Sequence, residues 1–146
     1  MFHPSSIISK KANIQKDVKI GPFCIIDDNV SIDSGTRLIS NIHISGNTYI
    51  GKNNTFYPYS TIGLPPQDKK FQGEESKLII GDKNTFREHV TINPGTLSGG
   101  LITRIENNCL IMVGSHIAHD CTISSNVILV NNSTLGGHVV IGENAI

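Results

Sequence analysis

Large apolar residues recur at every sixth position along most of the chain. One run extends from Ile8 to Ile62 and resumes in the same phase at Ile80, and a second run, shifted by one residue, begins at Ile105. A fixed period of this kind is the sequence signature of stacked structural repeats. The repeat positions are Ile8, Ile14, Ile20, Ile26, Ile32, Leu38, Ile44, Ile50, Phe56, Ile62, Ile80, Phe86, Ile92, Ile105, Ile111, Ile117, Ile123, Leu129, Leu135 and Ile141.

A small or β-branched residue follows most of these positions after four residues, as at Cys24, Thr36, Ser115 and Val127. We expect the large aliphatic side chain to point inward and the smaller one to fit a crowded interior corner. Glycine often follows the aliphatic residue directly, and we expect Gly or Asn to accommodate the turn between short strands. These glycines are Gly21, Gly51, Gly63, Gly81 and Gly142.

Three hexapeptides make one coil of about 18 residues, and such coils stack through parallel strand pairing at about 4.8 Å. The sequence therefore predicts an all-β fold, a parallel β-helix of hexapeptide repeats in the form of a triangular prism. Composition agrees with many short strands separated by tight turns, because isoleucine, asparagine and glycine are abundant and aromatic residues make up only 5% of the chain. Periodicity does not fix the hand of the coil.

The repeat lapses twice, between Ile62 and Ile80 and between Ile92 and Ile105. The first stretch is polar and holds a Pro-Pro pair that a central strand would not tolerate, and the second holds three glycines. We predict one domain, residues 1–146, with two external loops at about 63–79 and 93–104. Loops on a rigid scaffold concentrate function, and the charged run Gln67–Lys70 favours the first loop.

Charge and composition exclude several classes of protein. Lys+Arg and Asp+Glu both total 12, which disfavours a nucleic-acid-binding domain, and 38% hydrophobic residues disfavour a disordered chain. No apolar run reaches the roughly 20 residues of a membrane span, and the N-terminus lacks the layout of a signal peptide, so we expect a cytoplasmic location. The three cysteines occupy small inward positions, and we expect them to be buried without a disulfide, metal or redox role.

Three of the six histidines lie near the C-terminus, and the repeat places two of them together. His119 and Asp120 fall between two inward positions, at what we expect to be an outer corner of the prism. One coil later, about 18 residues on, His119 should stack near Gly137 and Asp120 near His138. The repeat alone therefore predicts one outward patch of these four residues.

This patch has the groups that acyl transfer needs. A histidine such as His119 can act as a general base near neutral pH, and a carboxylate such as Asp120 can orient the ring and stabilise its charged form. The backbone N–H of Gly137 can stabilise a developing oxyanion. No Ser or Cys is placed as a nucleophile, so direct attack by a hydroxyl or amine acceptor is simpler than an acyl-enzyme.

The remaining histidines divide into two groups. We expect His116, like His138, to contact the substrate, and we expect His3, His43 and His89 to be ordinary solvated side chains. A zinc enzyme is the rival chemistry, because β-helical carbonic anhydrases bind zinc through three histidines. His116 and His119 straddle an inward residue and do not form a clear chelate, so we predict no metal site.

Several longer motifs in the chain are more specific than the hexapeptide repeat. In these motifs the chain resembles the bacterial UDP-N-acetylglucosamine acyltransferases of lipid A synthesis. The resemblance runs along the whole chain. The motifs are Ile20-Gly21-Pro22-Phe23-Cys24, Gln67-Asp68-Lys69-Lys70-Phe71 with Gly73-Glu74, Arg87-Glu88 before Val90-Thr91-Ile92, His116-Ile117-Ala118-His119-Asp120-Cys121, and Gly136-Gly137-His138.

The resemblance implies a left-handed prism, a homotrimer with each site between two prisms, and no cofactor. It implies transfer of a 3-hydroxyacyl chain from acyl carrier protein to the 3-hydroxyl of UDP-N-acetylglucosamine. In these terms His119 matches the general base, Asp120 its orienting partner and Gly137 the oxyanion hole. The implied substrate-binding residues are Gln67, Asp68, Lys70, His116 and His138.

Members of this family continue for roughly another hundred residues, with more coils and a C-terminal helical domain. Because this chain stops inside the hexapeptide begun at Ile141, we expect a truncated form that carries the base and the loop but has little or no activity. Transfer at full-length rates would refute that expectation. Three alternatives stay open from the sequence: an N-acyltransferase acting on a UDP-3-amino sugar, an inactive β-helix that serves as a scaffold, and the zinc enzyme.

Overall fold

The computed structural model describes all 146 residues as a stack of short strands in three parallel sheets. The first sheet holds β1 (Ile7–Ile8), β4 (Ile25–Ile26), β7 (His43–Ile44), β10 (Thr61–Ile62), β13 (Thr91–Ile92), β16 (His116–Ile117) and β19 (Thr134–Leu135). The second holds β2 (Asn13–Ile14), β5 (Ser31–Ile32), β8 (Asn47–Ile50), β11 (Lys77–Ile80), β14 (Ile102–Ile105), β17 (Thr122–Ile123) and β20 (Val140–Ile141). The third holds β3 (Lys19–Ile20), β6 (Arg37–Leu38), β9 (Thr55–Phe56), β12 (Thr85–Phe86), β15 (Leu110–Ile111) and β18 (Ile128–Leu129).

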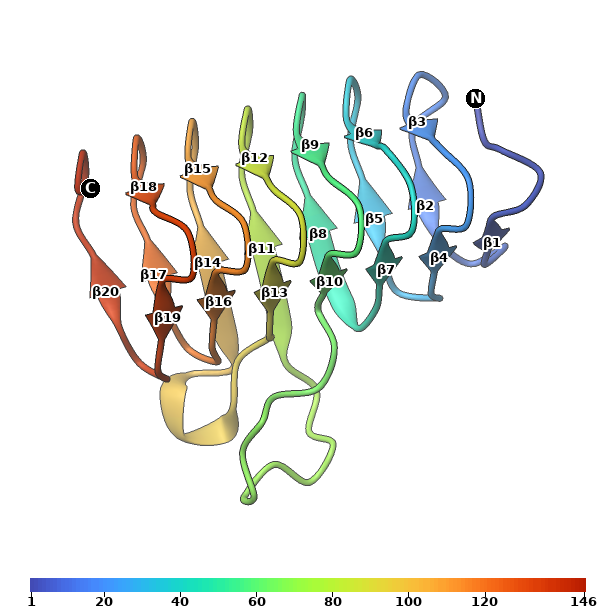
Figure 1. Cartoon of the computed structure of the whole chain (residues 1–146). Coiled ribbons are helices and arrows are strands. Elements are labelled where there is room, and N and C mark those ends of the chain that lie inside the picture. The colour runs from blue at the N-terminus through green and yellow to red at the C-terminus, as the bar shows by residue number, and fades with distance from the viewer.

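Successive strands visit the three sheets in turn, so the chain winds into a prism, and the winding is left-handed along the axis (Figure 1). This confirms the predicted fold class. The hand runs against the usual right-handed preference of parallel crossovers. Equivalent residues of neighbouring coils are in register, so that Ile92 of β13 pairs with Ile117 of β16 and Thr91 with His116. A given corner of the prism is therefore occupied by residues one coil apart.

The aliphatic repeat positions form the interior, as predicted. Away from the two ends of the prism they are at most 7% exposed, and they belong to one core cluster of 25 buried residues. Phe56 and Phe86 stack at the centre with ring centroids 4.7 Å apart and an interplanar angle of 10°. Cys24, Cys109 and Cys121 are buried and free, which confirms their expected packing role.

The glycines that directly follow an aliphatic position were predicted to accommodate the turns, and the structure gives Gly21 a different role. The left-handed backbone falls three residues after the aliphatic position and is most often taken by asparagine, as at Asn53 (φ 58°) and Asn126 (φ 62°). Gly21, directly after the aliphatic Ile20, does not have a positive φ. It is required because a Cβ there would overlap the carbonyl group of Ile39 in the next coil. Close approach between coils therefore selects this glycine.

The chain leaves the prism between β10 and β11 (residues 63–76) and again between β13 and β14 (residues 93–101). We call these segments loop 1 and loop 2. Loop 2 contains the one short 3₁₀ helix, η1 (Leu97–Gly99). Both loops project from the same lower edge in Figure 1, and the Asn93 side chain of loop 2 donates to the carbonyl of Leu64 in loop 1 at 3.1 Å. No helix of this structure has the length and apolar character needed to cross a membrane.

Candidate active site

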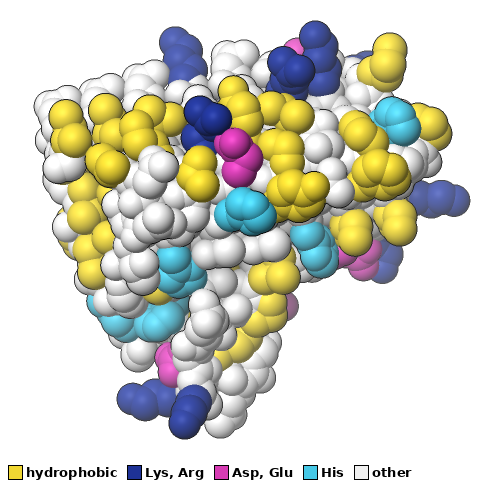
Figure 2. Space-filling view, in the orientation of Figure 1, with side chains coloured by type: hydrophobic (Ala, Val, Ile, Leu, Met, Phe, Trp, Pro, Cys, Tyr) yellow, Lys and Arg dark blue, Asp and Glu magenta, His cyan; other side chains and the backbone are white.

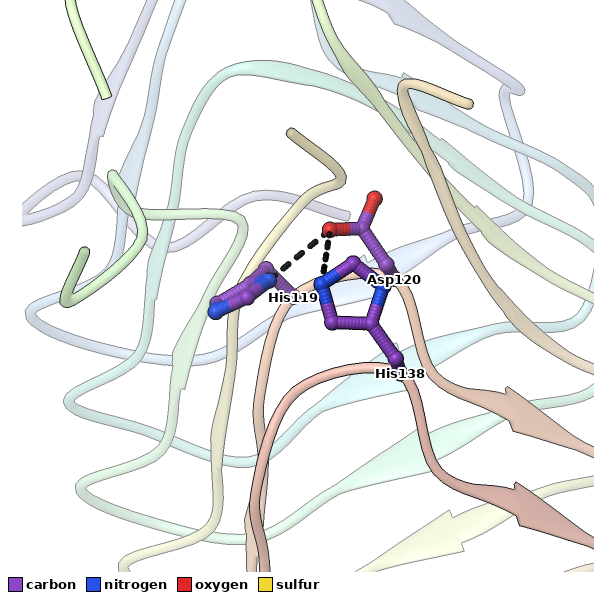
Figure 3. Close-up of side chains that lie close together, drawn as sticks. All are labelled: His119, Asp120 and His138. Atoms are coloured by element: carbon purple, nitrogen blue, oxygen red, sulfur yellow. Dashed lines mark hydrogen bonds and ion pairs between the residues drawn. The ribbon is translucent and has the colours of Figure 1, made fainter. Parts of the chain in front are cut away.

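The centre of the site is a contact between two consecutive residues, His119 and Asp120. Asp120 lies three residues after the inward Ile117, at the left-handed turn position, with φ 62°. This backbone turns its carboxylate back toward the preceding ring, and Nδ1 of His119 lies 2.8 Å from Oδ2 of Asp120 (Figure 3). The side chain of His119 is 16% exposed and that of Asp120 only 1%. Asp120 lies at the predicted corner of the prism, outside the core, but its carboxylate is not open to solvent because loop 2 covers it.

Loop 2 supplies most of the hydrogen bonds to this carboxylate. The backbone N–H of Thr96 donates to Oδ1 of Asp120 at 2.7 Å, and the Thr96 hydroxyl donates to Oδ2. The backbone N–H of Asp120 itself donates to Oγ1 of Thr103 at 2.9 Å. Burial alone would raise the pKa of Asp120, but the bonds from Thr96 and His119 outweigh it and hold this pKa below its ordinary value. The carboxylate is therefore ionised at neutral pH.

An ionised carboxylate can only accept hydrogen bonds, so the proton of neutral His119 resides on Nδ1. Nε2 then carries the free lone pair of the ring. This is the tautomer that a general base requires, with the carboxylate in place to stabilise the imidazolium once Nε2 has taken a proton.

The next coil brings the other two predicted residues against this pair. The N–H of His138 donates to the carbonyl of His119 at 3.0 Å, and the two rings meet edge to face with centroids 5.1 Å apart. Nε2 of His138 lies 3.7 Å from Oδ2 of Asp120, the same oxygen that faces His119 (Figure 3). The structure therefore brings His119, Asp120 and His138 together, as the stacking of coils predicted.

Gly137 lies directly against the imidazole of His119. A Cβ on this glycine would overlap the ring and would lie 2.7 Å from Nε2. The N–H of Gly137 donates to no protein acceptor. An unpaired backbone donor beside the basic nitrogen is the arrangement that can stabilise an oxyanion next to the point of proton transfer.

His116 lies on the first sheet, one residue before the inward Ile117. Its Nδ1 lies 2.6 Å from Oγ1 of Thr91, the paired residue of the preceding coil. Burial lowers the pKa of His116, and the positive charge that His119 carries once protonated lowers this pKa further. His116 is therefore neutral at pH 7, with one nitrogen committed to Thr91.

The residues predicted from loop 1 lie around a separate cavity between the two loops. Asp68 and Lys70 line this cavity of about 620 Å³ together with Glu74 and Thr96. Oδ1 of Asp68 accepts the backbone N–H of Lys70 at 3.0 Å, which shapes the turn. Gln67 is exposed and does not line the cavity. Figure 2 shows one group of histidines at the base of the lower projection, with other histidines spread over the face, and basic side chains at the tip of the projection.

Comparison with known proteins agrees with this geometry. Residues 102–137 match the family model of the bacterial transferase hexapeptide (six repeats). Over 142 residues the chain is 50% identical to the acyl-[acyl-carrier-protein]–UDP-N-acetylglucosamine O-acyltransferase of Thermodesulfovibrio yellowstonii, which covers 97% of the chain and 55% of the relative. The enzyme of the same name from Rickettsia canadensis is 49% identical over 120 residues, or 82% of the chain and 46% of the relative.

Solved structures give the same result. A crystal structure of UDP-N-acetylglucosamine acyltransferase superposes with a TM-score of 0.97 at 46% identity, over 98% of this chain and 55% of that one. LpxA from Acinetobacter baumannii gives a TM-score of 0.96 at 42% identity, over 97% and 55% of the two chains. The chain is similar to these UDP-N-acetylglucosamine O-acyltransferases over almost its whole length. It spans about half the length of the relatives that it matches.

Two histidines that were expected to be solvated have specific partners in the structure. Nε2 of His43 lies 2.9 Å from Oδ2 of Asp27, and the ring of His89 stacks on Tyr59 with centroids 5.3 Å apart. His89 is exposed, as expected of a solvated side chain, whereas His43 is half-buried. Neither belongs to the cluster of His119, Asp120 and His138. His3 is exposed, and its Nδ1 lies 2.8 Å from Oγ of neighbouring Ser5.

The ligand atoms of His119, Asp120 and His138 all lie within 4.8 Å of one another, a spacing that a metal ion could bridge. This trio differs from the pair of His116 and His119 weighed from the sequence. Both oxygens of Asp120 accept hydrogen bonds from Thr96, and one of them also faces Nδ1 of His119. A metal would have to displace these bonds, so the donor set fits a histidine–carboxylate pair better than a metal centre.

Three residues of this site were missed from the sequence: Thr96, Thr103 and Thr91. The Thr96 hydroxyl donates to the carboxylate of Asp120, and the Thr103 hydroxyl accepts the backbone N–H of Asp120. The Thr91 hydroxyl contacts Nδ1 of His116. Threonine is a common strand residue, so its identity carries no chemical signal. Register pairing of Thr91 with His116 was the one relationship that the repeat could have supplied.

Proposed function

We propose that this chain carries the catalytic centre of an enzyme that transfers a 3-hydroxyacyl chain from acyl carrier protein to the 3-hydroxyl of UDP-N-acetylglucosamine, the first step of lipid A biosynthesis. The observation that carries the proposal is the free Nε2 of His119 beside the unpaired N–H of Gly137, with Asp120 fixed behind the ring. Its relatives at 50% and 49% identity are named for this reaction.

The reaction begins when Nε2 of His119 takes the proton of the sugar hydroxyl while the hydroxyl oxygen attacks the thioester carbonyl. The negative charge that develops on the carbonyl oxygen is stabilised by the N–H of Gly137. Asp120 stabilises the imidazolium through Nδ1. Collapse of the tetrahedral intermediate breaks the carbon–sulfur bond, and the imidazolium returns its proton to the carrier-protein thiolate.

Substrate binding falls to the residues that surround this centre. We assign the sugar nucleotide to Gln67, Asp68 and Lys70 of loop 1, and we place His116 and His138 against the substrate beside the base. Asp68 and Lys70 line the cavity between the loops, and this cavity touches the catalytic pair only through Thr96. A site shared by two prisms would bring loop residues of one copy to the base of another.

We propose a homotrimer in the cytoplasm, with each site between two prisms. The first sheet, which carries His116, also carries Ile25, and the residues Phe23 (63% exposed) and Tyr59 (57% exposed) lie nearby. Such an apolar surface suits contact between copies. Sedimentation of the wild-type chain and of Phe23→Asp tests this: the variant should shift to monomer, and a wild-type monomer at micromolar concentration would contradict it.

An acyl-transfer assay tests the function. A chimaera in which these residues replace the matching segment of the Thermodesulfovibrio yellowstonii relative is incubated with UDP-N-acetylglucosamine and a panel of 3-hydroxyacyl carrier proteins. We expect O-acylated UDP-sugar, with less product from Lys70→Ala through a raised KM. Lys69→Ala is the matched control, since Lys69 does not line the cavity. A chimaera that transfers nothing would contradict the proposal.

The acceptor decides between the two closest reactions. The same base and oxyanion donor could serve an amine, so a UDP-3-amino sugar is assayed in parallel. If the chimaera prefers the amino sugar, the proposed reaction is N-acyl transfer and not O-acyl transfer. The spacing of His119, Asp120 and His138 keeps zinc as a second candidate, and metal analysis of the purified chain tests it, because one zinc per chain would support that alternative.

A further inference from the structure

Thr96 holds both oxygens of the Asp120 carboxylate. Its backbone N–H donates to Oδ1 at 2.7 Å, and its hydroxyl donates to Oδ2. His119, by contrast, contacts Oδ2 alone. Thr96 is only 2% exposed, so water does not compete for these bonds. Hydrogen bonds to a buried charge are among the stronger ones in proteins.

The backbone conformation of loop 2 places Thr96 where it can donate to the Asp120 carboxylate. Thr96 has extended backbone (φ −125°, ψ 165°) and precedes η1. Its carbonyl accepts the N–H groups of Gly99 at 3.1 Å and Leu101 at 2.9 Å, which closes the loop above the carboxylate. A Cβ on Gly99 would overlap Cγ of Asp120. The loop therefore packs directly onto the carboxylate and leaves no room for a side chain there.

Two histidines compete for the same carboxylate oxygen. Nδ1 of His119 lies 2.8 Å from Oδ2 of Asp120, and Nε2 of His138 lies 3.7 Å from it. These two rings are the titratable groups that face Asp120. Rotation of the carboxylate about its Cβ–Cγ bond would weaken the contact with His119. The two bonds from Thr96 oppose this rotation because they fix both oxygens at once.

We propose that Thr96 is a positioning residue that fixes the carboxylate plane of Asp120, so that Oδ2 serves His119 and keeps the proton of that ring on Nδ1. This inference rests on the proposed function, in which Nε2 of His119 is the base. It gives loop 2 a role in the reaction that does not require loop 2 to touch the substrate's reacting atoms.

Loop 1 contacts loop 2 next to Thr96, through the side chain of Glu74. One oxygen of Glu74 accepts the N–H of Gln72 in its own loop at 2.8 Å, and the other accepts the N–H of Leu97, the residue after Thr96, at 3.4 Å. Glu74 and Thr96 both line the cavity that holds Asp68 and Lys70. Loop 1 is therefore linked to the carboxylate through Thr96.

Nuclear magnetic resonance of the labelled chain tests the inference without turnover. A coupling across the hydrogen bond between the Thr96 amide nitrogen and the Asp120 carboxyl carbon is measured in the wild type, and the ¹⁵N shifts of His119 report its tautomer. Thr96→Val keeps shape and backbone N–H but removes the hydroxyl, whereas Thr96→Ser restores it. Ser98→Ala is the control, because Oγ of Ser98 lies 3.4 Å from Oγ1 of Thr96 but forms no hydrogen bond with Asp120.

We expect the coupling in the wild type, a loss of the Nδ1–H tautomer in Thr96→Val, and wild-type spectra in Thr96→Ser and Ser98→Ala. In the chimaera, kcat of Thr96→Val should fall about tenfold with KM little changed. An absent coupling, or a tautomer unchanged in a folded Thr96→Val, would overturn the inference. If Thr96→Val does not fold, the test is the wild-type coupling alone, and its absence would overturn the inference. Acyl transfer by His119→Ala at the wild-type rate would instead contradict the proposed function. The measured coupling between Thr96 and Asp120 would not be affected by that result.

Discussion

The side chains of His119 and Asp120 contact each other, Nδ1 to Oδ2 at 2.8 Å, although the two residues are consecutive in the sequence. Consecutive side chains on an extended strand point to opposite faces. The left-handed backbone of Asp120, φ 62°, removes this divergence. The hexapeptide turn, which closes every corner of the prism, thereby also builds the histidine–carboxylate pair.

Asp120→Asn tests the carboxylate. The amide is neutral, so it no longer stabilises the imidazolium, and it can hold the wrong tautomer of His119. We expect kcat of the chimaera to fall by about 100-fold, with KM within about twofold of the wild type. Steady-state kinetics measure both. Asp27→Asn is the matched control, because Asp27 forms a second histidine pair with His43 at 2.9 Å away from this cluster. Equal losses in both variants would argue against a specific role.

Gly137→Ala tests the contact between glycine and base. The added Cβ would overlap the ring of His119 and displace it. We expect transfer to fall by about 100-fold or more while the melting temperature changes little, since the site is near the surface. Gly136→Ala is the control, because a Cβ there meets no atom within 4 Å. The account is contradicted if Gly137→Ala transfers as fast as Gly136→Ala.

Acid should destabilise the fold in two windows. The pKa of His116 is lowered by burial and by His119, and that of Asp120 is lowered because its hydrogen bonds outweigh burial. The unfolded chain therefore binds these protons first as pH falls, below about 6.5 for His116 and below about 3.8 for Asp120. The free energy of unfolding should be greatest above pH 6.5 and fall on acidification. Urea denaturation from pH 7.5 to pH 3 measures the free energy of unfolding across both windows, and His116→Asn should flatten the upper one.

The sequence predicted the interior of the prism almost completely. An inward aliphatic such as Ile117 is specified by its own position in the repeat, and coil stacking then places His119 by Gly137. The burial of the Asp120 carboxylate could not be predicted in the same way. It depends on Thr96, which reaches it from loop 2, and a loop outside the repeat has no periodicity to fix its path. Gly21 was assigned to the turn because close approach of the next coil is not visible in a single hexapeptide.

Removal of the imidazole of His119 tests the central claim most directly. Initial rates of acyl transfer to UDP-N-acetylglucosamine are compared for the wild-type chimaera and His119→Ala, with folding checked by circular dichroism. We predict a loss of about 10²–10⁴-fold in kcat, the usual contribution of a positioned general base. A folded His119→Ala that transfers the acyl chain at the wild-type rate would contradict the account.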